Sequence, residues 1–229
     1  MQCSICGEER FSTKNVLWDK LINDWQLSKN EVSYINRQQG KTCNGCGANI
    51  RSIALANSIR SLIDTSLLLS EIPHLDNVTS LSILEINEAG SLTNTLKTLG
   101  DYTFAEYPEV DMHCLPYDEA TFDMVVHSDT VEHINNPVHA LAECHRVLKI
   151  GGGLCFTIPV IVGRMSRNRD GLSMSYHGNS DNLAEDYVVH TEFGADAWTY
   201  IIKAGFSDVS IHTFEYPAGI AFLARRTNA

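Results

Sequence analysis

The stretch Phe122–Pro159, with the sequence FDMVVHSDTVEHINNPVHALAECHRVLKIGGGLCFTIP, decides the fold of this chain. An apolar run is followed by a polar break at His127–Asp129, and a helical pattern then ends at three glycines. A second apolar run, Leu154–Ile158, stops at a proline. A strand, a helix and a second strand at this spacing build a parallel α/β sheet, and ligands bind outside the carboxyl ends of such strands. We therefore expect function to gather around residues 127–133.

Composition bounds the class of protein. The chain has 229 residues, enough for one α/β domain with a small appendage, and its formal net charge is −11. A surface this acidic repels phosphate backbones, which disfavours a nucleic-acid partner. No apolar run approaches the ~20 residues of a membrane span, and the first residues do not read as a signal peptide. We expect a soluble, cytoplasmic protein without a membrane partner, whose seven cysteines are thiols or metal ligands rather than disulfides.

Two CxxCG motifs mark the N-terminal region. Each supplies two cysteines, and the four are Cys3, Cys6, Cys43 and Cys46. Four thiolates on two tight turns form the closed tetrahedral set that a structural zinc ion takes. The alternatives are four reduced cysteines without a metal, or a redox pair, and the repetition of the motif disfavours both. We expect a zinc module over residues 1–70, with an amphipathic helix over 48–64 joining it to an α/β domain over 75–229.

Acidic residues lie at or just after the first two strands expected in the α/β domain. The apolar run Leu81–Ile86 contains Glu85 and leads into the loop Asn87–Ser91, while Tyr102–Ala105 is followed by Glu106. An acid at this distance beyond a first strand, loop and helix suits binding of ribose hydroxyls, because one carboxylate can accept from both. The order of elements therefore favours a nucleotide-containing cofactor.

Together these segments resemble a class I S-adenosylmethionine-dependent methyltransferase of the type 11 subgroup, whose members act on small molecules and glycans. The resemblance covers roughly residues 81–222 and rests on Leu84-Glu85-Ile86, Phe122-Asp123, Val131-Glu132-His133 and the HRVLKxGG pattern at 145–152. It implies a Rossmann-like, seven-stranded sheet with an antiparallel last strand. It also implies S-adenosylmethionine as cofactor and O-methylation of a small-molecule or glycan (sugar) acceptor.

The resemblance further implies which residues hold the cofactor. The loop after the first strand would line the methionine part of the cofactor, and the acid after the second strand would bind its ribose. The next loop would contact its adenine, and the end of the strand beginning at Phe122 would flank its methyl group. These residues are Glu85, Ile86, Asn87, Gly90, Glu106, Tyr107, Asp111, Met112, His127 and Ser128. Structural roles are the alternatives, with Glu85 as a helix cap and Asp111 as a turn residue.

A hydroxyl acceptor must lose a proton during methyl transfer, and histidine suits that task near neutral pH. The candidate bases are His133 in the VEH motif, and His177 and His190 in the polar stretch 160–190; packing or a surface position is the alternative for each. The same stretch carries three arginines, which suit an anionic acceptor or form a solvated basic loop. They are Arg164, Arg167 and Arg169.

Two features depart from the family pattern. The loop Asn87–Ser91 has one glycine where the family has three, and the path from Glu106 to Asp111 is short. Glycines permit positive φ and close approach of a cofactor to the backbone, although asparagine tolerates the left-handed region better than most residues. Two alternatives therefore stay open. One is an inactive binding protein with the methyltransferase fold, and the other is an RNA methyltransferase, which the acidic balance disfavours.

Overall fold

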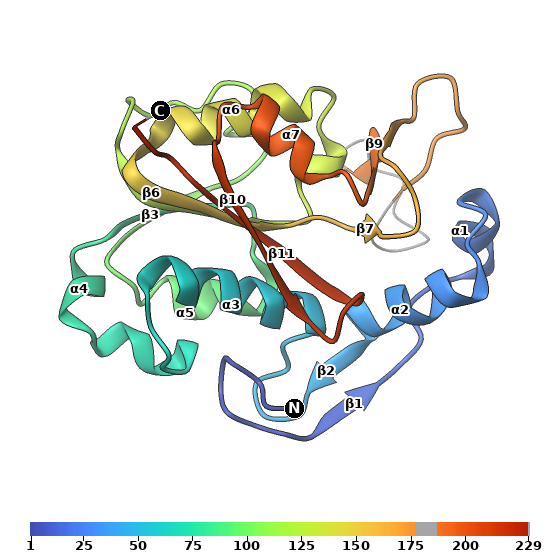
Figure 1. Cartoon of the computed structure of the whole chain (residues 1–229), viewed down its shortest axis with the longest axis horizontal. Coiled ribbons are helices and arrows are strands. Elements are labelled where there is room, and N and C mark those ends of the chain that lie inside the picture. Colours follow the sequence, from blue (N-terminus) through green and yellow to red (C-terminus); the bar gives the residue numbers. More distant parts are fainter. Residues whose placement is uncertain (177–186, 229) are drawn as a thin grey trace.

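The computed structural model describes residues 1–176 and 187–228, and its centre is a six-stranded sheet in the order β10-β11-β6-β5-β3-β4 (Figure 1). Four strands are parallel, namely β6 (Leu148–Thr157), β5 (Phe122–Ser128), β3 (Ser82–Ile86) and β4 (Asp101–Ala105). The last strand, β11 (Gly219–Arg225), runs antiparallel to both of its neighbours, β6 and β10 (Asp208–Phe214). The Rossmann-like fold with an antiparallel last strand is confirmed.

The sheet has six strands in the described part of the chain, where seven were expected. The edge strand β4 is followed by turns through residues 106–121, which lead directly into β5. Hydrogen bonds from Val110 N to Glu106 O (2.9 Å) and from Cys114 N to Asp111 O (3.0 Å) close two of these turns. Five residues span at most about 18 Å when extended, which is too short for the helix and strand that the family places here.

Helices cover both faces of the sheet (Figure 1). On one face lies α3 (Ile50–Ile63), packed on β6, β10 and β11, and on the other lie α6 (Pro137–Val147) and α7 (Trp198–Lys203). Successive side chains of β5 point to opposite faces of the sheet, since Val126 belongs to the apolar cluster of α3 and Val125 belongs to the apolar cluster of α6. Asn49 caps the start of α3 by accepting from Ser52 N at 2.8 Å.

The N-terminal module is built on a two-stranded sheet of β1 (Phe11–Thr13) and β2 (Lys41–Cys43), with helices α1 (Asp19–Asp24) and α2 (Lys29–Gly40). Ser28 and Glu31 form a capping box at the start of α2. One continuous apolar cluster joins Cys3 and Cys43 to α3 and to sheet residues such as Val126. The expected joining helix is therefore also a layer of the α/β core.

The remaining elements are short. A three-stranded sheet in the order β7-β9-β8 lies beyond the carboxyl end of β6. The bounds of these elements are η1 Leu69–His74, α4 Asp76–Thr79, η2 Gly90–Leu92, α5 Thr93–Leu96, η3 Val131–His133, β7 Val160–Ile161, β8 Arg167–Asn168 and β9 Thr191–Gly194. Among the described residues, no helix combines the length and apolar character needed to cross a membrane.

Candidate functional site

The four N-terminal cysteines converge at one point. Their Sγ atoms all lie within 4.8 Å of one another, with Cys3 3.8 Å from Cys46 and Cys6 3.6 Å from Cys43. A tetrahedral zinc ion with Zn–S bonds of about 2.3 Å separates its sulfurs by about 3.8 Å. The cluster therefore has the size of a four-thiolate metal site.

Glycines give the cysteine turns their shape. Gly7 N donates to Cys3 O at 2.8 Å and Gly47 N donates to Cys43 O at 2.9 Å, and both glycines have positive φ values, 80° and 75°. Burial raises the pKa of Cys3 to about 11. Burial also raises the pKa of Cys46, whereas for Cys43 the hydrogen bonds within the cluster outweigh burial and lower the pKa. A metal ion binds cysteines as thiolates, so it would offset the charge of the four sulfurs.

At the carboxyl end of β3, Glu85 organises the loop expected to hold the cofactor. Its side chain is fully buried and accepts from Ala89 N at 2.7 Å, from the Thr93 hydroxyl at 2.6 Å and from the Tyr102 hydroxyl. Asn87 and Gly90 take positive φ values of 52° and 61°. The loop therefore reaches the left-handed region twice with a single glycine, because Asn87 supplies the other position.

The loops after β3 and β4 are tied together. Asn87 N donates to Ala105 O at 2.8 Å, and its side-chain oxygen accepts from Tyr107 N at 3.1 Å. Glu106 and Tyr107 are exposed beside this link, whereas Ile86 is buried in the core. The acid expected to bind ribose thus stands at the surface next to the loop organised by Glu85.

The adenine candidates lie in a turn. Asp111 Oδ1 accepts from His113 N at 2.8 Å and lies 3.0 Å from His113 Nδ1. Met112 is 4% exposed and belongs to the apolar cluster of α6. These contacts agree with the turn role weighed for Asp111, and an adenine contact at Asp111 and Met112 stays a prediction.

The end of β5 carries a polar network that faces α3. The Ser128 and Thr157 hydroxyls lie 2.8 Å apart, and Thr157 donates to Asp129 Oδ1 at 3.3 Å. The other Asp129 oxygen pairs with the Arg51 guanidinium of α3. Asp129 has a φ of 49°, a strained value for a residue with a side chain.

Sequence reasoning did not single out the Arg51–Asp129 pair. The two residues are 78 positions apart, so no local pattern links them. One signal was present, because Arg51 interrupts the apolar set of its amphipathic helix. A charge at such a position needs a partner when its helix packs on a core.

His127 is placed in the core. Its side chain is fully buried and its ring centroid lies 4.8 Å from that of Phe156. Burial lowers the pKa of His127 to about 3, against a smaller opposite effect of Glu132. The imidazole is therefore neutral near pH 7, and its contact with a cofactor stays a prediction.

Acid should destabilise the protein through His127. The folded-state pKa lies below the unfolded value of about 6.5, so the unfolded chain binds the extra proton and stability falls as the pH drops from about 6.5 toward 3. By about pH 5 the loss relative to neutral pH should reach about 2 kcal/mol. Urea unfolding at both pH values measures it. His127→Phe should remove this loss, whereas His74→Phe at an exposed position should keep it. An equal loss of stability between the two pH values in both variants would contradict the assignment.

The structure brings two of the three candidate bases together. His133 Nδ1 lies 3.0 Å from Val188 O, its Nε2 lies 3.6 Å from Glu132 Oε1, and His190 N donates to Glu132 O at 2.8 Å. Burial, and then the nearby His133, lower the pKa of His190. A general base must be in its neutral form to accept a proton, and the lowered pKa of His190 favours that form. His177 lies outside the described residues.

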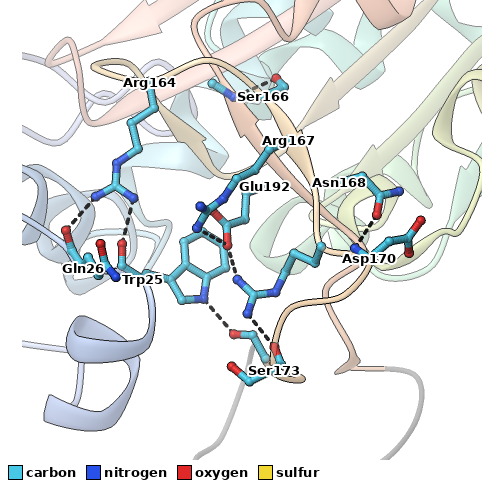
Figure 2. Close-up of polar contacts among 12 residues, drawn as sticks. Trp25, Gln26, Arg164, Ser166, Arg167, Asn168, Asp170, Ser173 and Glu192 are labelled. Carbon is cyan, nitrogen blue, oxygen red and sulfur yellow. Dashed lines mark hydrogen bonds and ion pairs between the residues drawn. The ribbon is translucent and has the colours of Figure 1, made fainter.

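The three arginines after Pro159 make protein contacts (Figure 2). Arg164 pairs with Glu31 at 2.7 Å and donates to the carbonyl oxygens of Trp25 and Gln26. Arg167 and Arg169 both donate to the buried carboxylate of Glu192, and Figure 2 shows Arg167 beside Glu192. They therefore join the 160–190 stretch to the N-terminal module and to β9, instead of forming a solvated basic loop.

Comparison with known proteins agrees with this fold. Residues 76–156 match the family model described as "Methyltransferase domain", which confirms the expected resemblance. No curated protein matches the chain.

Similar solved structures include the [4+2]-cyclase SpnF, at 16% identity over 66% of this chain and 77% of that one, with a TM-score of 0.45. A putative methyltransferase from Bacillus halodurans is 17% identical over 73% of this chain and 99% of that one, with a TM-score of 0.44. A chain in a complex of the Haloferax volcanii Trm112 methyltransferase activator and the putative methyltransferase is 13% identical over 79% of this chain and 99% of that one, with a TM-score of 0.43. Likenesses this remote carry no argument about substrate.

Proposed function

We propose that this chain, whose residues 76–156 match the methyltransferase-domain family, transfers the methyl group of S-adenosylmethionine to a hydroxyl of a small-molecule or glycan acceptor. The loop Glu85–Gly90 carries the proposal, because its capped, left-handed conformation persists with one glycine. Exposed backbone in such a loop lets a cofactor approach closely. The reduced glycine content therefore does not by itself argue for an inactive protein.

Different residues of this chain bind different parts of the cofactor. Backbone around Asn87 and Gly90 lines the methionine part, and the exposed Glu106 carboxylate accepts from the ribose hydroxyls. The bound cofactor supplies an electrophilic methyl group. We assign alignment of the acceptor with that methyl group to Ser128 and Asp129, which share a polar network at the end of β5.

His133 and His190 are the candidate bases for the acceptor proton. Burial lowers the pKa of His190, so its imidazole is free to accept a proton at neutral pH. Glu132 is 1% exposed, and its Oε1 lies 3.6 Å from His133 Nε2, so the carboxylate orients that imidazole toward its task. We further propose that Cys3, Cys6, Cys43 and Cys46 hold a structural zinc ion, since all four ligand positions are filled by protein.

Glu106→Gln tests the cofactor site. A hydrogen bond to a charged acceptor contributes about 1.5–3 kcal/mol, so the variant should bind S-adenosylhomocysteine about 10- to 100-fold more weakly in calorimetry. Glu109→Gln removes the same charge three positions away at an exposed site and should bind like the parent protein. Absence of binding by the parent protein, or equal weakening in both variants, would refute this site.

Two alternatives are separated from catalysis by simple readouts. An inactive binding protein would bind S-adenosylhomocysteine but would transfer no labelled methyl group to any acceptor. An RNA methyltransferase would retain RNA at low salt. The net charge of −11 and the engagement of Arg164, Arg167 and Arg169 with protein groups disfavour this alternative.

A further inference from the structure

A cavity of about 270 Å³ lies between the N-terminal module and the end of the central sheet. Residues 16–18, α1 and α2 form one side, and Pro159–Ile161 form the other. Its volume is close to the lower end of the range of about 300–1,000 Å³ typical of ligand pockets. The space therefore suits a single ring with short substituents.

The cavity adjoins the proposed reaction end. Pro159, on its wall, follows Thr157 by two residues, and the Thr157 hydroxyl contacts both Ser128 and Asp129. Two residues of extended chain span at most about 7 Å. The wall at Pro159 therefore lies within about 7 Å of Thr157, which contacts the end of β5, where the methyl group of the cofactor is expected.

None of the residues that line this cavity is charged. Two indoles, Trp18 and Trp25, and several aliphatic side chains form most of the surface, and Gln38 and Gln39 add amide groups. Moving a charged group into such surroundings without a partner is costly, whereas hydroxyl groups can bond to amides. A neighbouring cavity of about 220 Å³ differs, because Arg164, Arg167 and Glu192 line it and are held in ion pairs.

Fixed contacts hold the walls in place. Trp25 Nε1 donates to the Ser175 hydroxyl at 2.7 Å, and the Arg169 guanidinium carbon lies 5.7 Å from the indole centre. The backbone N–H groups of Val16 and Leu17 donate to Asn36 Oδ1 at 2.7 and 3.0 Å. The cavity is therefore preformed, as small-molecule sites generally are.

We infer that this cavity is the acceptor site, and that the acceptor is an uncharged, hydroxyl-bearing ring with one apolar face. The inference rests on the proposed methyl transfer and adds the substrate class. A neutral sugar ring and a phenol share this chemistry, since each presents C–H or π surface to indole and hydroxyls to amides. The N-terminal module then has two tasks, because the segment between its metal-ligand pairs also builds the substrate pocket.

Ligand-observed NMR titration of the full chain tests the inference with two matched probe pairs. Methyl β-D-glucopyranoside is compared with methyl β-D-glucuronide, and p-cresol with 4-hydroxybenzoate, so that each pair differs by a carboxylate. At least one neutral probe should bind, and its charged counterpart should bind about tenfold more weakly or not at all. The pair that binds identifies a sugar or an aromatic ring. Binding of neither neutral probe, or tighter binding of a charged one, would overturn the inference.

Variants of the wall locate the binding. Trp18→Ala should weaken the neutral probe about tenfold by removing an aromatic face, and Gln39→Glu should weaken it by placing a charge on the wall. Asn30→Asp adds the same charge to an exposed position of the same helix, away from the lining, and should have no effect. Unchanged binding in both wall variants would place the probe elsewhere and overturn the inference.

Calorimetry with S-adenosylhomocysteine separates this inference from the proposed function. All three variants should bind it like the parent protein, because none of the substituted residues belongs to the cofactor loops. Probe binding that depends on the wall, together with no S-adenosylhomocysteine binding, would refute methyl transfer while leaving the ligand site in place. Normal S-adenosylhomocysteine binding without probe binding would refute the cavity and leave methyl transfer standing.

Discussion

Cys43→Ser is expected to abolish stoichiometric metal binding and to lower the free energy of unfolding by more than about 4 kcal/mol. The four-cysteine site closes the module through residues 43 positions apart. Cys3 and Cys43 also belong to the apolar cluster that includes α3 and the sheet residue Val126. Loss of the metal should therefore loosen α3 from the sheet as well as the N-terminal turns.

Metal content by mass spectrometry and urea unfolding, with and without a chelator, measure both effects. Cys114→Ser is the matched control, because Cys114 is an exposed cysteine outside the cluster. It should keep one equivalent of zinc and change stability by less than about 0.5 kcal/mol. A parent protein that carries no metal, together with unchanged stability of the Cys43→Ser variant, would show that the cluster is four reduced thiols.

The second large effect is expected at Glu85. Glu85→Ala leaves two buried donors, Ala89 N and the Thr93 hydroxyl, and the half-buried Tyr102 hydroxyl without their acceptor. Each unsatisfied buried group costs about 1–3 kcal/mol, so the two buried donors should lower stability by about 2–6 kcal/mol. The loop that these bonds shape should open, and affinity for S-adenosylhomocysteine should fall at least about 100-fold.

Glu85→Gln provides a milder test if the alanine variant does not fold. One acceptor oxygen remains, so the variant should fold and lose affinity about tenfold. Glu88→Gln removes the same charge from an exposed side chain three positions away, and it should match the parent protein in urea unfolding and in calorimetry. Normal cofactor affinity in a folded Glu85 variant would contradict the role of this loop.

Local signals made much of the fold predictable. The apolar runs at β3, β5 and β6 are buried as expected, and the Ser28 capping box and the helix stop at Gly40 set the limits of α2. The two CxxCG motifs predicted the convergence of four sulfurs, because each motif shapes its own turn. These features depend on residues a few positions apart, which a sequence displays directly.

Features that depend on distant residues were not predictable in this way. Arg164 pairs with Glu31 across 133 positions and Arg51 with Asp129 across 78, and neither pairing leaves a local pattern. For the same reason, the stretch after Pro159 suggested an anionic acceptor, whereas its arginines bind protein groups. Among the described residues the sheet has six strands instead of seven, because the Glu106–Asp111 path is too short for a further helix and strand. This short path was visible in the sequence, but it was not enough to predict the loss of a strand.

Backbone NMR mapping of S-adenosylhomocysteine onto the full chain tests the central claim most directly. We expect saturable shifts that cluster at the carboxyl ends of three strands, in the amides of Asn87–Gly90, Glu106 and Ser128–Asp129. Little change is expected around the four cysteines. Absence of shifts up to millimolar ligand, or shifts confined to other surfaces, would contradict it.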